Sequence, residues 1–164
     1  IATGKTEQQL AAGFDSVSVC LSKGLGAPIG SLVCGTRDFL KRCHRFRKMH
    51  GGGMRQAGIL AAAGLYAIDH HRARLADDHA NAKAFAEALA SNISLVVRQP
   101  ATNLVFFEVT RGSAAELMAK AKERGVLLGS GTTATSVRAV AHLDVDRDAV
   151  LHAAKVIAEL AAAL

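Results

Sequence analysis

Apolar and polar residues alternate over residues 14–23, and this period of two predicts a β-strand. One face of the strand would carry bulky side chains together with a lysine, and the other only small side chains. The bulky face consists of Val17, Val19, Leu21 and Lys23, and the small face of Ser16, Ser18, Cys20 and Ser22. A glycine-rich turn at 24–28 breaks the pattern, and a second, mainly apolar strand is predicted at 29–35. We expect the two strands to form a buried pair.

Helical periodicity and end signals predict helices on both sides of this strand pair. The predicted helices are 5–12, 37–49, 54–69 and 73–90. Thr36 is a suitable N-cap for the second of them, and three glycines at 51–53 should separate it from the third. The fourth is half apolar and half charged, so we interpret residues 71–92 as a helix that bridges two domains.

From residue 93 onward the predicted elements become short and alternate between strand and helix, which is typical of a small α+β domain. Strands are predicted at 95–97, 103–109, 126–128 and 136–141, and helices at 114–124 and 147–163. Gly129-Ser130-Gly131 has the composition of a flexible turn. The chain is therefore expected to be an α/β protein with the end of one domain at 1–70, a bridging helix at 71–92 and a small domain at 93–164.

The amino-acid composition limits the classes of protein to which the chain can belong. Half of the 164 residues are apolar and charges are spread along the chain, as in a soluble globular protein. The longest apolar stretch is too short to cross a bilayer, which predicts no membrane span. The formal charge is +6, yet basic residues are dispersed and aromatic residues are few, so small anionic ligands explain it better than nucleic acid. The densest basic run, 41–48, is either a solvated helix face or a contact with an anion or a second subunit.

The sequence also predicts the cellular compartment of the protein and whether the chain is part of a longer one. Three cysteines, Cys20, Cys34 and Cys43, make an odd number, and two of them lie in apolar strand-like runs, so we expect free thiols and a reducing cytoplasm. The chain starts with Ile1 rather than methionine and lacks the charged-then-apolar pattern of a signal peptide. We interpret it as the inside of a longer protein.

The first candidate for chemistry is Lys23, which follows an apolar strand and precedes a glycine-rich turn. A lysine in that position can be held rigidly and away from water, and its amine can then act as a nucleophile. The small side chains of the opposite face leave room for a flat ligand, and the glycines of the turn allow close backbone contact.

The second candidate is the segment 48–58, Lys-Met-His-Gly-Gly-Gly-Met-Arg-Gln-Ala-Gly. Free backbone amides at a helix N-terminus attract anions, and Arg55 would add a forked donor for phosphate. Alternatively, the glycines only allow two helices to turn tightly. The segment is not a P-loop, because the Gly-Lys-Ser/Thr ending is missing.

The third candidate is Arg138, within a strand whose other residues are mainly apolar. An arginine in that setting needs a carboxylate partner, which is either an internal Asp or Glu or the carboxylate of an amino-acid substrate. The seven histidines never combine with cysteine or acid at metal-ligand spacing, so no metal is predicted. A serine-hydrolase elbow is absent as well.

Together, three motifs resemble the low-specificity L-threonine aldolases in identity and order. They are Ser22-Lys23-Gly24-Leu25-Gly26-Ala27-Pro28-Ile29-Gly30, then Lys48-Met49-His50-Gly51-Gly52-Gly53-Met54-Arg55-Gln56, then Arg138-Ala139-Val140-Ala141-His142-Leu143-Asp144. The third motif departs from the family at Ala139 and Ala141, where larger or polar residues are more frequent. The resemblance covers essentially the whole chain and implies the aspartate-aminotransferase-like fold of pyridoxal-phosphate enzymes, with the end of the cofactor-binding large domain followed by the small domain.

The resemblance also implies roles for residues. Lys23 matches the lysine that forms a Schiff base with pyridoxal 5′-phosphate, Arg55 an arginine that reaches the cofactor phosphate across a subunit interface, and Arg138 the arginine that binds the substrate carboxylate. The implied reaction is aldol cleavage of L-threonine or L-allo-threonine to glycine and acetaldehyde in a homodimeric or homotetrameric cytoplasmic enzyme. The rest of the family's cofactor site would lie before Ile1.

Two other functions remain open. A related β-eliminating lyase or a phenylserine-type aldolase would use the same lysine, and assays of several β-hydroxy amino acids would distinguish them. A truncated chain could also be an inactive domain that only packs against a partner.

Overall fold

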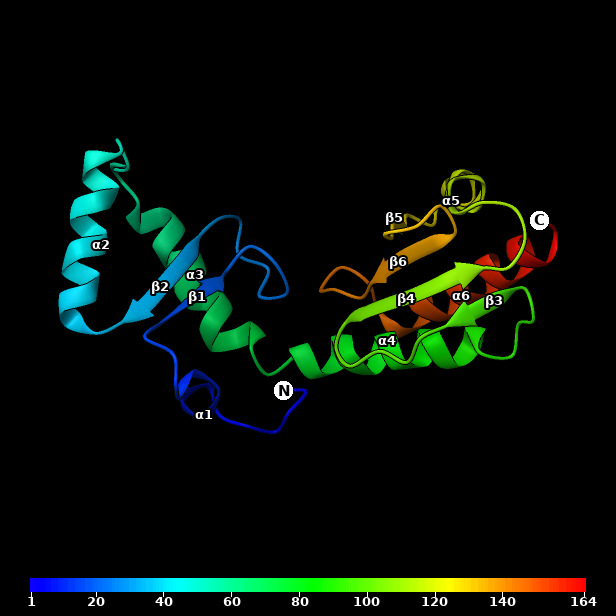
Figure 1. Ribbon diagram of the computed structural model, residues 1–164, viewed down its shortest axis with the longest axis horizontal. Helices are drawn as coiled ribbons and strands as arrows, with labels where there is room; N and C mark the ends of the chain where they lie inside the picture. Colours follow the sequence, from blue (N-terminus) through cyan, green and yellow to red (C-terminus); the bar gives the residue numbers. More distant parts are fainter. The chain divides into compact units, whose positions relative to one another are not determined.

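The computed structural model describes residues 1–164, which divide into two compact units, 3–74 and 75–164 (Figure 1). The first unit contains α1 (Glu7–Ala11), β1 (Ser16–Cys20), β2 (Ser31–Gly35), α2 (Arg37–Met49) and α3 (Gly58–His71). The second contains α4 (Leu75–Leu89), β3 (Leu95–Val97), β4 (Leu104–Val109), α5 (Ala114–Glu123), β5 (Gly129–Ser130), β6 (Ser136–Val140) and α6 (Arg147–Ala162). No helix is both long and apolar enough to cross a lipid bilayer.

In the first unit, β1 and β2 pair antiparallel, from Ser16 opposite Gly35 to Cys20 opposite Ser31. Side-chain caps fix the starts of α1 and α2. Thr6 accepts a hydrogen bond from the amide of Gln9 and forms a capping box with it, and Thr36 accepts one from the amide of Phe39. The predicted helix at 37–49 is thus confirmed with its cap.

The strand pair of the first unit is exposed rather than buried, which corrects the expectation from its apolar pattern. Every residue of β2 is exposed, and in β1 only Val17 is even half-buried. A two-stranded sheet has two faces, and the helices of this unit do not cover them. The buried apolar side chains of the unit are Leu21, Ala27 and Ala67.

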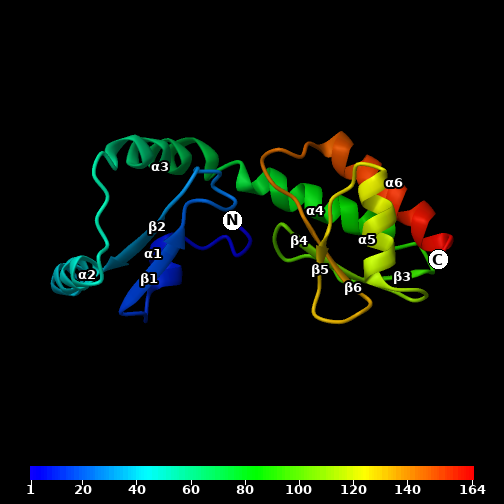
Figure 2. The ribbon, with the colours of Figure 1, turned by 90° about the horizontal axis from the view of Figure 1, so that it is seen from above.

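The second unit is a four-stranded antiparallel sheet in the order β3-β4-β6-β5, with α4, α5 and α6 on one face (Figure 2). Alternation along β4 explains the arrangement, because Val105, Phe107 and Val109 are buried while Phe106 is exposed. The core joins these residues to Leu89, Leu117 and Ile157 of the three helices. One face of the sheet is left open.

Two expectations about the second unit need correction. Residues 126–128 form no strand, and Gly129–Ser130, expected to be a turn, is the short edge strand β5 paired with β6. The helix expected as a bridge at 71–92 begins at Leu75 and buries Phe85 and Leu89 in the core of the second unit. Its apolar stripe packs on α6 and the sheet, so the helix belongs to that unit.

Candidate active site

Lys23 lies in a tight loop, 21–30, between β1 and β2. The strand ends at Cys20, so the lysine is not on the strand face with Val17 and Val19 as the alternation predicted. Backbone hydrogen bonds close the loop: the amide of Leu21 donates to the carbonyl of Gly30 at 2.9 Å, that of Ala27 to Leu21 at 3.0 Å, and that of Gly26 to Lys23 at 2.8 Å. Gly26 and Gly30 have φ values of +70° and +125°, which side chains would oppose.

Helix α3 holds this loop. Leu21 and Ala27 are buried against Ala67, and a Cβ added to Gly64 would lie 3.1 Å from the Leu21 side chain, so the helix approaches the loop closely because position 64 is glycine. The Nδ1 atom of His71 is 2.7 Å from the carbonyl oxygen of Leu25. The lysine loop therefore rests on the second half of α3.

The side chain of Lys23 itself is exposed and makes no hydrogen bond or ion pair within the chain. Its backbone is fixed while its amine is free to meet a ligand. That combination suits covalent attachment to an aldehyde.

Arg55 lies in the connection from α2 to α3, three residues before the helix begins at Gly58 rather than at Met54 as predicted. The next residue, Gln56, has a φ of 53° and is the one non-glycine residue with positive φ. This left-handed residue turns the chain, and it explains why the helix starts late. The Arg55 side chain is exposed and forms no ion pair.

Lys23 and Arg55 are associated with opposite ends of α3, because Arg55 directly precedes the start of the helix at Gly58 and the Lys23 loop contacts its later turns. The lysine loop contacts the helix between Gly64 and His71. At 1.5 Å per residue, roughly 10–20 Å of helix separates these contacts from the first turn. The chain does not bring the amine and the guanidinium together.

Arg138 is exposed on the open face of the second unit's sheet. It stands opposite Phe106 on β4 and Gly129 on β5. The acid on this face, Glu108, is already paired with Arg98 at 3.0 Å, so Arg138 has no carboxylate partner. The structure therefore does not contain the internal Asp or Glu partner that was one of the two alternatives for Arg138. Its guanidinium is available to a ligand.

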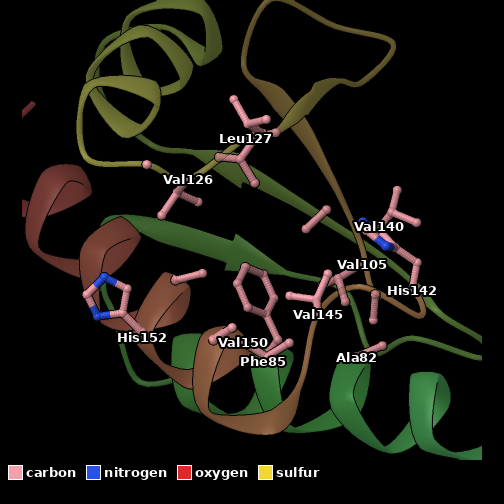
Figure 3. A pocket seen from close by; sticks show the side chains of 16 residues that line it. Ala82, Phe85, Val105, Val126, Leu127, Val140, His142, Val145, Val150 and His152 are labelled. Atoms are coloured by element: carbon pink, nitrogen blue, oxygen red, sulfur yellow. The ribbon is translucent and has the colours of Figure 1, made fainter.

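A pocket of about 320 Å³ opens on the other, helix-covered face of this sheet (Figure 3). Its walls are mainly apolar, with Phe85, Val105 and Val150 around it and His142 and His152 at its sides. Arg138 does not line it. This pocket thus lies away from the predicted substrate arginine.

Sequence reasoning missed the residues of α3 that support the lysine loop. Gly64, Ala67 and His71 are spaced at i, i+3 and i+7, which places them on one face of a helix. The spacing could have marked that face, although nothing in it indicates which loop the helix contacts.

Comparison with known proteins agrees with this architecture. The family model described as beta-eliminating lyase matches residues 1–112. A low specificity L-threonine aldolase of Escherichia coli O157:H7 is 49% identical over 148 residues, covering 90% of this chain and 43% of the relative. Low-specificity L-threonine aldolase 1 of Arabidopsis thaliana is 41% identical over 147 residues, covering 87% and 41%. The chain thus spans less than half the length of these relatives.

Solved structures give the fold. A protein from Exiguobacterium sp. 255-15, described as a candidate aromatic amino acid beta-eliminating lyase/threonine aldolase, superposes with a TM-score of 0.78 at 18% identity, over 96% of this chain and 48% of that one. An aspartate aminotransferase from Rhodobacter sphaeroides 2.4.1 gives a TM-score of 0.69 at 21% identity, over 90% and 40%.

The fold is therefore that of the aspartate-aminotransferase-like enzymes, as predicted. The chain belongs to the beta-eliminating lyase family. The predicted resemblance to low-specificity L-threonine aldolases is confirmed.

Proposed function

We propose that this chain is the C-terminal part of a pyridoxal-phosphate-dependent threonine aldolase, a carbon-carbon lyase that cleaves L-threonine or L-allo-threonine to glycine and acetaldehyde. The observation that carries the proposal is Lys23, an unpaired amine on a loop fixed by α3, in a chain 49% identical to a low specificity L-threonine aldolase. The first unit would be the end of the cofactor-binding large domain, and the second the small domain.

The residues present fit pyridoxal 5′-phosphate chemically. Lys23 offers a primary amine without an internal partner, which is what an aldehyde requires. Arg55 offers a forked guanidinium without an internal acid, which suits phosphate. The cofactor, when bound, supplies the electron sink that lets the Cα–Cβ bond of the substrate break.

Lys23 would hold the cofactor through Nζ, and the same atom would carry a proton whenever it is not bound to the cofactor. Arg138 would bind the substrate carboxylate, since its guanidinium is exposed and Glu108 is occupied by Arg98. Phe106 flanks the arginine on the adjacent strand and limits the side from which a carboxylate can approach.

The distance along α3 favours a homo-oligomer, a dimer or tetramer. Because Lys23 and Arg55 occupy opposite ends of the helix, we infer that Arg55 serves the cofactor held by a second copy. We also place the enzyme in the cytoplasm and in amino-acid metabolism. The three cysteines are free thiols, which suits a reducing compartment.

Two alternatives have support of their own. The matching family is described by β-elimination, so a β-eliminating lyase or a phenylserine-type aldolase would use the same lysine. An inactive domain that packs against a partner is favoured by the exposed apolar residues of the first unit, such as Phe14, Met54 and Ile59.

The proposal is tested by assaying the whole protein for glycine and aldehyde release. L-threonine, L-allo-threonine, phenylserine and a substrate with a β-leaving group should be compared. We expect acetaldehyde and glycine in equal amounts from the first two, and loss of at least about a thousandfold in rate for Lys23→Ala. Pyruvate release from the last substrate without aldehyde release from the others would instead identify a β-eliminating lyase.

A further inference from the structure

We propose that His71 is a positioning residue for Lys23, which it holds in place through the carbonyl of Leu25. The inference rests on the proposed function, because it assumes that Lys23 is the cofactor lysine. His71 lies on α3, 46 residues along the chain from Leu25, and its Nδ1 is 2.7 Å from the Leu25 oxygen. The two groups are brought together only by the fold.

The chemistry of this contact defines the state of the imidazole. A carbonyl oxygen can only accept, so Nδ1 must carry the proton and donate it. The second ring nitrogen, Nε2, takes no part. Tyr66, five residues earlier on the helix, packs edge-on against the His71 ring with centroids 5.5 Å apart, which restricts the rotation of the imidazole. His71 is half-buried, so water competes less for the bond than at the surface.

The bond acts where the loop is otherwise weakest. Leu21 and Ala27 anchor the two sides of the loop by burial against α3. Between them, Lys23 is held only by the turn in which its carbonyl accepts the Gly26 amide. Fixing the Leu25 carbonyl fastens the middle of this turn to the helix, two residues from the lysine. Without it, the turn and the Lys23 Cα can shift relative to a ligand.

Two substitutions separate the hydrogen bond from the bulk of the side chain. In Asn the amide nitrogen is as many bonds from the backbone as Nδ1, whereas in Gln it corresponds to Nε2. His71→Asn can therefore still donate to Leu25, and His71→Gln cannot do so from the same place. His70→Gln is the matched control, because the neighbouring His70 packs on Tyr66 with ring centroids 4.2 Å apart, whereas the hydrogen bond to Leu25 comes from His71.

The experiment measures the dissociation constant of pyridoxal 5′-phosphate for the whole protein by absorbance titration, and amide hydrogen exchange in residues 21–30. For His71→Gln we expect a dissociation constant raised about fivefold and faster exchange at Gly26 and Ala27. His71→Asn and His70→Gln should remain within about twofold of the unsubstituted protein.

Other results would overturn either the inference about His71 or the proposed function. Equal losses in the Asn and Gln variants would show that the ring packs rather than donates, and no loss in either would show that the bond is dispensable; both overturn the inference. If wild-type protein binds the cofactor at a lysine other than Lys23, the proposed function fails instead. The exchange data then still decide whether His71 orders the loop.

Discussion

The two units of this chain differ in how they use apolar residues. The first buries three apolar side chains and the second twenty, although the two are of similar length. Burial of apolar surface is the main stabilising term in folding, so the second unit carries the stability of the chain. The unpaired Lys23 and Arg55 belong to the weakly packed first unit. Its candidate chemistry is therefore placed on a framework that needs further protein surface around it.

The largest expected effect tests the core of the second unit. Phe107→Ala removes a ring that is 0% exposed and should destabilise the chain by about 3–5 kcal/mol. Phe106→Ala, the next residue on the open face at 38% exposed, should cost under about 1 kcal/mol. Urea unfolding followed by circular dichroism measures both. Similar losses for the two variants would contradict the division of the sheet into a covered and an open face.

The next effect concerns Arg138 on that open face. If it binds the substrate carboxylate, Arg138→Ala in the whole protein should raise the KM for L-threonine about a hundredfold, since a charged hydrogen-bonding pair is lost. The free energy of unfolding should hardly change, because the guanidinium has no internal partner. Steady-state kinetics and urea unfolding together check this. Lost stability with unchanged KM would make Arg138 a structural residue.

A smaller effect is expected at Gly129, which lies beneath the same guanidinium. A Cβ there would lie 3.2 Å from Nη2 of Arg138 and would push it aside. Gly129→Ala should raise KM about fivefold with little change in kcat. Ser130→Ala, on the same strand, is the control and should leave KM unchanged. A kcat effect without a KM effect would argue against a role in substrate binding.

The smallest effect tests how the first unit holds its loop. Gly64→Ala places a methyl group 3.1 Å from the Leu21 side chain, and the crowding is partly offset by better helix propensity, for a net loss of about 0.5 kcal/mol. Gly58→Ala meets no atom within 4 Å and should be neutral or slightly stabilising. Hydrogen exchange at the Leu21 amide should therefore accelerate in the first variant only.

Local signals predicted local structure well. The Thr36 cap and the glycines after Met49 define α2 to the residue, and the strands predicted at 103–109 and 136–141 correspond to β4 and β6. The predictions failed where contacts between residues far apart in the sequence determine the local structure. Lys23 leaves the strand because α3 buries Leu21 and Ala27, and the edge strand β5 exists only because β6 pairs with it.

In the candidate site, too, residues in local motifs could be predicted and residues that depend on remote contacts could not. The three basic residues could be identified from their motifs, and their exposure is consistent with ligand binding. The residues that support the lysine loop could not be identified from the sequence, because the contact of His71 with Leu25 joins residues 46 positions apart. The left-handed Gln56 also escaped notice, since glutamine carries no signal for positive φ.

The central claim is that Lys23 is the cofactor lysine, and borohydride reduction tests it most directly. The whole protein is incubated with pyridoxal 5′-phosphate, reduced, digested and mapped by mass spectrometry. The account predicts one stable pyridoxyl label, on the peptide that contains Lys23, and far less label on the isolated 164-residue chain. A label at another lysine of the whole protein, or no label at all, would contradict it.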